Sequence, residues 1–295
     1  MATTNPPSEL LELAVAVAVQ AGRMLATGRP PGRPQVVGTK SSPTDVVTEM
    51  DRVSERLIID RIGEARPGDA FLSEERGAVR PATPSAGRVQ AGGAVVRWII
   101  DPIDGTVNYL YGLPDWAVSI AAELSGRVVA GVVYVPPRGE LFTAVLGGGA
   151  WLQRQSAEGS PSGSQSARPV RCASGVALSE ALVATGFGYE VARRVVQGEV
   201  VAGLLPRVRD IRRGGSAAVD LCSVAAGRVD AYYERGINYW DHAAGGLIAA
   251  EAGATVAGLS GKAAGPDLTI AAGPGLFAAL HDLLAALDPE RDGPV

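Results

Sequence analysis

The sequence predicts an α/β (α+β) fold with a β-rich first half and an alternating second half. After residue 95, apolar segments separated by Gly and Pro turns are typical of an antiparallel meander. From about residue 170 to residue 287, strand-like and helix-like patterns alternate, which indicates a mixed α/β layer. The 295 residues are 46% hydrophobic and can bury a sizeable core. We expect one domain, 1–295, with subregions of about 9–155 and about 170–287.

Two helices are expected to precede the sheet. Ser8 is a suitable N-cap for a helix over about residues 9–25, in which leucines and valines form a wide apolar stripe. Thr48 precedes a second helical pattern, which ends at Pro67-Gly68. The segment AFLSEERG is then expected to form a short strand that ends in acidic residues.

The two subregions differ in their strand pattern. The meander is predicted from VVRWIID, WAVSIAAEL, VVAGVVYVP and ELFTAVLG, and GGGAWLQRQ adds a hairpin. The Ser- and Gly-rich segment SAEGSPSGSQSARP is the best candidate for an internal boundary. Beyond it, we expect strands in ALVATGF, VRDIRR and AYYERG, and helices in VARRVVQGEVVAGLLPRV, GSAAVDLCSVAAGRVD and WDHAAGGLIAAEAGA. Residues after Ala286 are expected to fray.

The composition argues against several classes of protein. A formal net charge of −4 lacks the basic surplus that is typical of nucleic-acid binding. Two separated cysteines, Cys172 and Cys222, are expected to be core thiols in a reducing compartment. The N-terminus has no basic region of a secretory signal, and the apolar stretch Leu10–Ala21 is too short to span a bilayer. We therefore expect a cytoplasmic protein without a membrane partner.

The most distinctive segment is DPIDGT, which follows the apolar run VVRWII. Pro102 lacks a backbone N–H and is expected to end the strand in a turn. Such a turn would direct Asp101 and Asp104 toward one point, with the carbonyl of Ile103 between them. Hard divalent cations bind this mixture of oxygens. An ordinary Asp-Gly turn with solvated acids is the alternative, and the segment taken alone favours it.

Two further acidic positions are candidate metal ligands. Glu74 and Glu75 follow AFLS, and adjacent strand residues point to opposite faces, so only one of them can bind a given ion directly. Asp241 lies where the last strong helix begins and can act as its N-cap, as a metal ligand, or as both. A charged strand end and a helix cap are the simpler interpretations. His242, the next residue, is expected on the surface.

Gly105 and Thr106 add features that suit an anion. Glycine permits close approach of the backbone, and the N–H groups at the start of a helix attract negative charge. If GTVNYL opens a helical turn, its N–H groups form a cradle, and the hydroxyl of Thr106 can hold a water. Acids for metal and N–H groups for phosphate together indicate a phosphate that is bridged by metal ions.

The segments SEE, DPIDGTVNYLYGLP and WDHAAGGLIAAEAGA resemble the motifs of the inositol monophosphatase family, which comprises metal-dependent, lithium-sensitive sugar phosphatases. KSSPTDVVTEMD and GSAAVDLCSVAAGRVDAYYERG also match the family, and the motifs span residues 40–254 in family order. The resemblance implies a layered αβαβα sandwich, with an N-terminal antiparallel sheet and a C-terminal mixed α/β sheet. It also implies a homodimer.

The resemblance assigns roles to single residues. It implies two or three Mg²⁺ ions bound by Glu74, Asp101, Asp104, Asp241 and the carbonyl of Ile103. It implies a water positioned by Glu75 and Thr106, with help from Asp51. It implies a substrate held by Gly105, Thr106, Gly215, Ser216, Ala217, Glu234 and Asp241. Tyr189 is bulkier than the small polar residue that is usual near this place, which puts the size of the substrate in question.

The implied reaction is Mg²⁺-dependent hydrolysis of myo-inositol monophosphate by a metal-activated water. Phosphatases for fructose 1,6-bisphosphate, histidinol phosphate and 3′-phosphoadenosine nucleotides share the metal motifs, so these substrates are alternatives. Some bacterial members of the family resemble regulators that bind the transcription machinery, which is an alternative of a different class. The expected partners are an inositol phosphate or a related sugar phosphate and a second copy of the chain.

Overall fold

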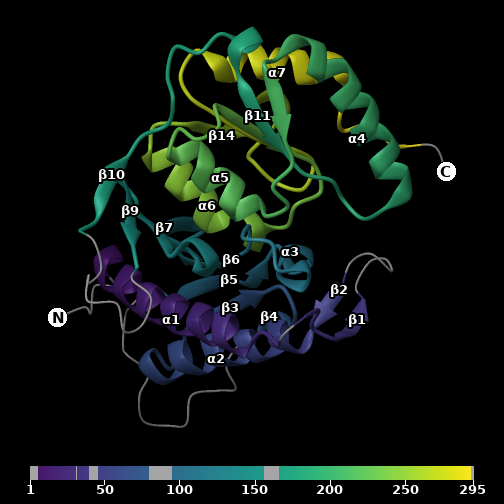
Figure 1. The fold of residues 1–295 in the computed structure, drawn as a ribbon. Helices are drawn as coiled ribbons and strands as arrows, with labels where there is room; N and C mark the ends of the chain where they lie inside the picture. The colour runs from purple at the N-terminus through teal and green to yellow at the C-terminus, as the bar shows by residue number, and fades with distance from the viewer. Residues whose placement is uncertain (1–5, 31, 40–45, 80–94, 156–165, 294–295) are drawn as a thin grey trace.

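The computed structural model describes residues 6–30, 32–39, 46–79, 95–155 and 166–293, which form five layers (Figure 1). A pair of helices, an eight-stranded sheet, a second pair of helices, a five-stranded sheet and a third pair of helices follow each other. The helix pairs are α1 (Pro7–Gly28) with α2 (Glu49–Ala65), α5 (Ala217–Ala225) with α6 (Tyr239–Glu251), and α4 (Val191–Leu204) with α7 (Leu276–Leu287). The expected αβαβα sandwich is confirmed.

The eight-stranded sheet contains the expected meander. Its strand order is β10-β9-β8-β7-β6-β5-β3-β4, and β5 to β9 pair with their chain neighbours in antiparallel fashion. Strand β3 pairs with β5 in parallel, so the sheet is mixed near this edge. The bounds are β3 (Ala70–Ser73), β4 (Gly77–Val79), β5 (Val96–Asp104), β6 (Ala117–Leu124), β7 (Arg127–Val135), β8 (Glu140–Val145), β9 (Ala150–Arg154) and β10 (Arg168–Val170).

Strand β5 continues through the proline that was expected to end it. Its register against β6 shifts between Asp101, which pairs with Ser119, and Asp104, which pairs with Ala117. Over this interval β5 holds one residue more than β6, which is a β-bulge. Pro102 lies inside the bulge, where the ladder needs no N–H donor, so a strand that contains a proline is tolerated.

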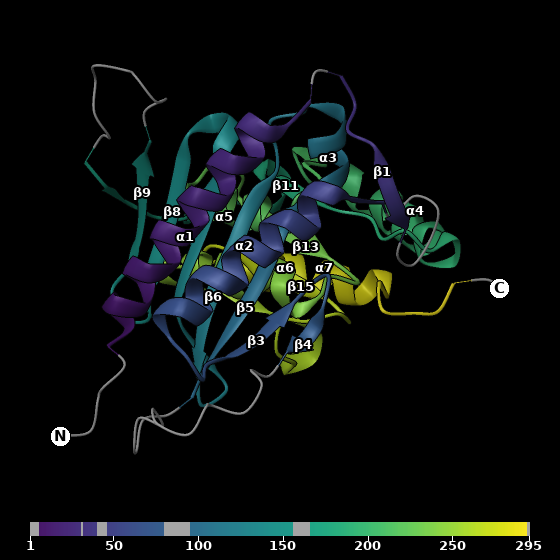
Figure 2. The ribbon, with the colours of Figure 1, turned by 90° about the horizontal axis from the view of Figure 1, so that it is seen from below.

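Helix α1 extends beyond the predicted range at both ends. Its N-cap is Pro6, so Ser8 lies in the first turn and does not cap the helix as expected. By length and composition alone, its 22 residues would suffice to cross a membrane. Leu10, Val17 and Leu25 are buried in a core that α1 shares with α2 and the eight-stranded sheet. Figure 2 shows both helices lying across the outer face of this sheet.

The five-stranded sheet has the order β12-β11-β13-β15-β14. Strand β11 is parallel to β12 and β13, whereas β15 is antiparallel to β13 and β14. The alternating pattern correctly predicted β11 (Leu182–Thr185), β12 (Asp210–Arg212) and β13 (Ala231–Glu234). It did not predict β14 (Thr255–Ala257), β15 (Thr269–Ala272) or α7.

The end of the chain is held more firmly than expected up to residue 293. Glu290 forms an ion pair with Lys262 at 2.8 Å. The guanidinium of Arg291 donates to the carbonyl of Leu287, which ends α7. The prediction that residues after Ala286 fray is therefore wrong for this segment.

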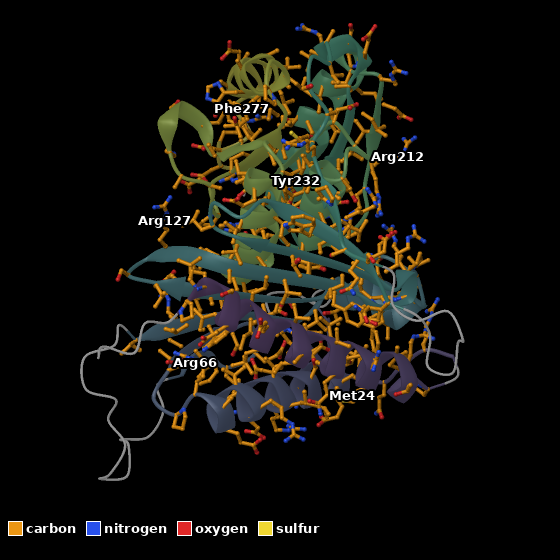
Figure 3. All side chains as sticks on the ribbon, turned by 90° about the vertical axis from the view of Figure 1, so that its left-hand side faces the viewer. Met24, Arg66, Arg127, Arg212, Tyr232 and Phe277 are labelled. Carbon is orange, nitrogen blue, oxygen red and sulfur yellow. The ribbon has the colours of Figure 1, made fainter. Side chains whose placement is uncertain are left out.

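Four apolar clusters fill the spaces between the five layers. Trp98 lies between the sheet and α1–α2, and Phe142 lies on its other face against α5–α6. Tyr232 lies between α5–α6 and the five-stranded sheet, and Leu280 belongs to the cluster beneath α4 and α7. Each of these side chains is at most 1% exposed. Figure 3 shows how side chains occupy these spaces, with Tyr232 in the interior.

Shorter elements complete the fold. Strands β1 (Val36–Thr39) and β2 (Val46–Thr48) form a two-stranded sheet, and α3 (Thr106–Tyr111) follows β5 after one residue. The 3₁₀ turns are Pro136–Arg138, Leu178–Glu180, Leu205–Arg207 and Leu259–Gly261.

Candidate active site

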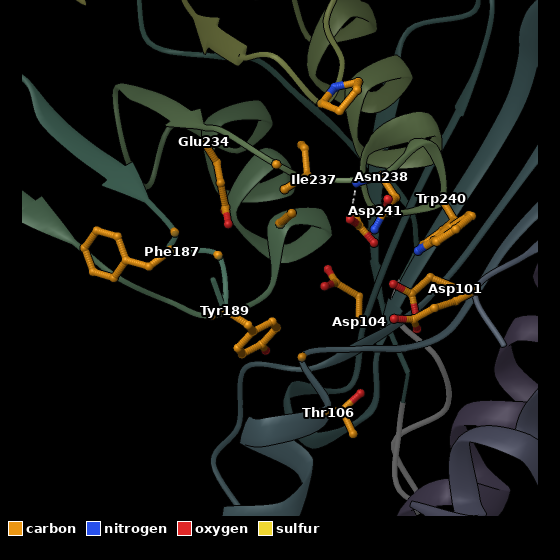
Figure 4. Close-up of a pocket in the computed structure, with 18 of the residues that line it drawn as sticks. Asp101, Asp104, Thr106, Phe187, Tyr189, Glu234, Ile237, Asn238, Trp240 and Asp241 are labelled. Atoms are coloured by element: carbon orange, nitrogen blue, oxygen red, sulfur yellow. Dashed lines mark hydrogen bonds between the residues drawn. The ribbon is translucent and has the colours of Figure 1, made fainter. Parts of the chain in front are cut away.

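A cavity of about 480 Å³ lies among the ends of several elements (Figure 4). The eight-stranded sheet, the starts of α3, α5 and α6, and the end of β13 all contribute to its lining. The predicted site residues that line it are Glu74, Asp101, Ile103, Asp104, Gly105, Thr106, Gly215, Ala217, Glu234 and Asp241. Three other predicted site residues, Asp51, Glu75 and Ser216, lie outside the lining.

The parallel pair β3 and β5 brings the first acids together. Parallel strands end at the same edge of a sheet, so Glu74 follows β3 beside the end of β5. The backbone N–H of Glu74 donates to the carbonyl of Ile100 at 3.2 Å, which continues the ladder by one step. Asp101 is 1% exposed, and its Oδ1 accepts the N–H of Ile103 at 3.0 Å. The sheet and its bulge therefore fix the positions of these residues.

Asp104 is held by the first turn of α5. Its Oδ2 accepts hydrogen bonds from Ser216 Oγ and from the N–H of Ala218, both at 2.6 Å. Burial raises the pKa of Asp104 to about 6, although these hydrogen bonds favour the ionised form. Ser216 also caps α5 by accepting the N–H of Val219. Ser216 thus lies behind Asp104, where it orients this carboxylate.

Asp241 enters the cavity from the first turn of α6. The N-cap of α6 is Asn238, whose N–H donates to Asp241 Oδ2 at 2.5 Å, so the expectation that Asp241 is the N-cap is wrong. Burial, followed by the charges of Glu74 and Asp104, raises the pKa of Asp241 well above its usual range. In Figure 4 the carboxyl groups of Asp101, Asp104 and Asp241 face the same part of the cavity.

Thr106 connects the cavity to a buried acid behind it. Its Oγ1 lies 3.0 Å from Asp51 Oδ1 and 3.1 Å from the carbonyl oxygen of Ile103, so its single hydrogen can be donated to either acceptor or shared between them. Asp51 is fully buried, and its Oδ2 accepts both the N–H and the hydroxyl of Thr48 at the start of α2. Burial raises the pKa of Asp51, and the charge of Glu75 adds to this effect. The three predicted catalytic residues are therefore neighbours.

The start of α3 requires glycine. Gly105 has a φ of 94°, in the left-handed region, and a Cβ there would lie 2.8 Å from the carbonyl oxygen of Asp115. The side chain of Asn108 donates to the carbonyls of Asp115 and Gly214, at 2.5 and 2.9 Å. Asn108 thereby ties α3 to the segment before α5. No pattern in the sequence indicated this role of Asn108.

The other side of the cavity belongs to the second half of the chain. Glu234 ends β13, and its Oε2 accepts the hydroxyl of Tyr232 at 2.9 Å. Burial raises the pKa of Glu234 to about 7. The lining also includes residues that the sequence analysis did not assign to the site, among them Gly186, Phe187, Gly188, Arg193, Ile237, Asn238, Trp240 and Pro266. The glycine-rich segment GFGY, which follows β11, could have indicated Gly186, Phe187 and Gly188 as site residues.

His242 is buried, so the expectation of a surface histidine is wrong. It is 7% exposed because the first turn of α6 packs against the eight-stranded sheet. Its ring contacts that of Tyr239 edge-on at 5.4 Å between centroids. Burial lowers its pKa to about 4. The imidazole is therefore neutral at physiological pH.

The acidic side of the cavity fits a hard divalent cation in its chemistry. Carboxylates and a backbone carbonyl are the ligands that Mg²⁺ prefers, and the raised pKa of Asp241 reflects negative charge gathered in a buried place. Within the described part of the chain, no three His, Cys, Asp or Glu side chains are arranged to hold a metal ion as they stand. To share one ion, these carboxylates would have to rotate toward it.

Sequence comparisons identify the family of the chain. The chain matches the model of the inositol monophosphatase family over residues 7–290. The "Inositol-1-monophosphatase SuhB" of Mycobacterium tuberculosis is 48% identical over 254 residues, which cover 85% of this chain and 81% of the relative. The "Nus factor SuhB" of Escherichia coli is 37% identical over 253 residues, which cover 85% of this chain and 86% of the relative.

Solved structures share the five-layer architecture. Mycobacterium tuberculosis SuhB has a TM-score of 0.76 at 40% identity, with 97% of this chain and 100% of that chain covered. An inositol monophosphatase from Anabaena (Nostoc) has a TM-score of 0.75 at 29% identity, with 96% and 97% covered. The family that these comparisons indicate implies phosphatase activity and generally depends on metal. The chain belongs to the inositol monophosphatase family.

Proposed function

We propose that the protein hydrolyses myo-inositol monophosphate to inositol and phosphate in a Mg²⁺-dependent reaction. The observation that supports this proposal is the convergence of Glu74, Asp101, Asp104 and Asp241, from separate elements, on one cavity. The start of α3 at Gly105 lies at the same cavity and provides N–H groups for an anion. Membership in the family supports the choice of substrate.

Two or three Mg²⁺ ions would be held by Glu74, Asp101, Asp104, Asp241 and the carbonyl of Ile103. When bound, the ions supply positive charge against the phosphate oxygens and lower the pKa of a coordinated water. Each of Asp104 and Asp241 has one carboxylate oxygen in hydrogen bonds to the protein, so the other oxygen would be available to an ion. Mg²⁺ suits the site because it binds oxygen and retains waters.

Thr106 and Asp51 would orient the attacking water. The hydroxyl of Thr106 donates its hydrogen toward Asp51, so its oxygen remains an acceptor for a hydrogen of the water. That hydrogen bond would turn a lone pair of the water toward phosphorus. Glu75 lies close enough to raise the pKa of Asp51, and it would assist from behind the cavity.

The substrate would be bound from two sides. The N–H groups of Gly105 and Thr106 lack partners within the helix at the start of α3 and would donate to phosphate oxygens. Gly215 and Ala217 would lie against the polyol ring, and Glu234 would bind its hydroxyls. With a pKa near 7, the carboxyl of Glu234 can accept or donate such hydrogen bonds.

Other features of this proposal follow from the family. Fructose 1,6-bisphosphate, histidinol phosphate and 3′-phosphoadenosine nucleotides are the alternative substrates. We also propose one catalytic domain, inhibition by Li⁺, a homodimer and a cytoplasmic location. These properties are tested by kinetics, by light scattering and by cell fractionation.

A phosphate-release assay tests the reaction. The wild type should release phosphate from myo-inositol 1-phosphate with Mg²⁺ and not with EDTA. Asp101→Asn should remove nearly all turnover, whereas Asp282→Asn, an exposed acid on α7, should not. Mg²⁺ should also raise the melting temperature of the wild type, because it relieves repulsion among the carboxylates. Equal melting curves with EDTA and Mg²⁺, or normal activity of Asp101→Asn, would refute the assignment.

A second candidate function is a role with the transcription machinery. Relatives from Escherichia coli and Pasteurella multocida that are named "Nus factor SuhB" are 37% and 38% identical to the chain, which supports this candidate. A pull-down of purified transcription complexes with the wild type and with Asp101→Asn separates the two roles. Equal binding by both proteins would support a role apart from catalysis, and no binding by either would exclude it.

A further inference from the structure

The cavity also carries positive charge, which the proposed hydrolysis does not use. Arg193, in the first turn of α4, and Arg213, which follows β12, both line it. The segment Gly186–Glu190 connects β11 to α4, and both arginines contact this segment. Arg213 lies 6.0 Å from the centre of the Phe187 ring, and Arg193 lies against Gly188. Two guanidinium groups thus flank one short segment of the lining.

Arg193 occupies a space that two glycines keep open. A Cβ at Gly188 would lie 3.0 Å from Arg193 Cδ, and a Cβ at Gly236 would overlap Arg193 Nη1. It forms an ion pair with Glu190 at 3.6 Å, and 59% of the Glu190 side chain is exposed. An ion pair of that length and exposure is weak. Arg193 therefore keeps most of its capacity to bind another anion.

Arg213, like Arg193, lies against a glycine of the cavity lining. A Cβ at Gly215 would overlap Arg213 Nη1, so this guanidinium lies over a residue of the proposed polyol pocket. Within the residues that the structure describes, no carboxylate comes within 4.0 Å of it. Its charge acts over longer distances and partly opposes the rise that burial causes in the pKa of both Asp104 and Glu234. Arg213 is thus close to the proposed polyol side of the cavity and forms no ion pair with an acid among the described residues.

We infer that Arg193 and Arg213 form a subsite for a second phosphate, so that the enzyme prefers polyol phosphates that carry two phosphate groups. This inference rests on the proposed phosphatase function and concerns its substrate class. Guanidinium groups bind phosphate through paired N–H bonds and remain charged at all physiological pH values. A cavity of about 480 Å³ has the volume of a small-molecule site and leaves room beyond a single polyol ring.

If the two arginines only stabilise the structure of the cavity, their loss should have a different effect on the kinetics. If Arg213 only offset the negative charge of Glu234 and Asp104, its loss would affect every substrate alike. A subsite for a second phosphate would instead change the ratio between two substrates. The matched pair myo-inositol 1-phosphate and myo-inositol 1,4-bisphosphate differs only in that second phosphate. The ratio of their kcat/KM values therefore separates the two roles.

Kinetics on this pair test the subsite. The wild type should have a higher kcat/KM for the bisphosphate than for the monophosphate. Arg193→Gln and Arg213→Gln should each lower that ratio about tenfold, which corresponds to about 1.4 kcal/mol of lost preference. Arg194→Gln is the matched control, because Arg194 is exposed on α4 and lies outside the lining. An unchanged ratio in both cavity variants, or a wild type that prefers the monophosphate, would overturn the inference.

Calorimetry in EDTA gives a second readout without turnover. The wild type and Arg194→Gln should bind the bisphosphate more tightly than the monophosphate, and the two cavity variants should lose that difference. If the enzyme releases phosphate from the monophosphate but prefers the bisphosphate in neither experiment, the subsite is refuted and the proposed phosphatase function still holds. No release from either ester with any divalent cation would instead overturn the proposed function itself.

Discussion

Glu55 supports the acidic side of the cavity although it does not line it. It lies on α2, is 1% exposed, and its Oε1 accepts the backbone N–H groups of Glu75 and Arg76 at 3.0 and 3.2 Å. Its Oε2 forms an ion pair with Arg76 Nε at 3.1 Å. The carboxylate thus holds the turn that carries Glu74. We predict that Glu55→Gln destabilises the fold and impairs catalysis.

The size of the effect follows from these contacts. In Glu55→Gln the amide oxygen can still accept hydrogen bonds from the two backbone N–H groups. The NH₂ group then faces the guanidinium of Arg76, and because both groups are donors, no hydrogen bond forms between them. Hydrogen bonds to a charged group contribute about 1.5–3 kcal/mol, and those made by a neutral amide contribute about 1 kcal/mol. The ion pair adds little, because 42% of the Arg76 side chain is exposed. We expect the free energy of unfolding to fall by about 2–3 kcal/mol.

Urea unfolding and phosphate release measure the two consequences. Glu49→Gln is the control, because Glu49 lies on the same helix and pairs with Arg56 at 3.2 Å, with both side chains about half exposed. That change should cost at most about 0.5 kcal/mol and leave turnover intact. Glu55→Gln should also lower kcat/KM about tenfold, because Glu74 is displaced. Equal stability of the two variants would refute the role given to Glu55.

Three further changes test the packing and the site. Among the described residues, Arg228→Met leaves the buried Glu140 with the exposed Arg154 as its one ion-pair partner, so the free energy of unfolding in urea should fall by about 3 kcal/mol. A loss below about 1 kcal/mol would contradict this. Gly105→Ala puts a side chain at a φ of 94°, so phosphate release should fall at least tenfold while circular dichroism stays native. The pKa of Glu234 is raised from 4.5 to about 7, so its protonation stabilises the fold at low pH and this contribution is lost as pH rises through 7. At pH 8 the free energy of unfolding of Glu234→Gln should therefore exceed that of the wild type by up to about 3 kcal/mol, whereas at pH 4 the two should be equal. A difference that does not depend on pH would argue against burial as the cause of the raised pKa.

The elements that carry contiguous motifs were predictable from the sequence. DPIDGT combines acids, a proline and a glycine in six residues, and Asp101 and Asp104 do line one cavity, although a β-bulge places them there and not the expected turn. The meander was also predictable, because its strands are long and separated by clear turns. Strand β14 has only three residues, too few for an alternating pattern. Helix α7 did offer a signal, since Leu276, Leu280 and Leu284 recur at helical spacing and are all buried.

Contacts between distant segments could not be predicted. Glu55 binds residues 20 and 21 positions away, and Asn108 binds the carbonyl of Gly214 across 106 positions. No local pattern distinguishes such a residue from an ordinary polar one. The burial of His242 has the same origin, because it depends on how α6 packs against the sheet. Family resemblance supplied the roles of Glu74 and Asp241, for which the residues alone favoured simpler interpretations.

The two sides of the cavity are joined at Asp104. This residue belongs to β5, yet its carboxylate is held by Ser216 and Ala218 from α5. Burial raises the pKa of Asp104 to about 6, whereas these hydrogen bonds favour its ionised form. The ionised form is the one that binds a cation. The same turn of α5 places Gly215 and Ala217 in the cavity lining, where we propose that the polyol binds. A shift of α5 would therefore change cation binding and substrate binding together, even if every carboxylate were kept.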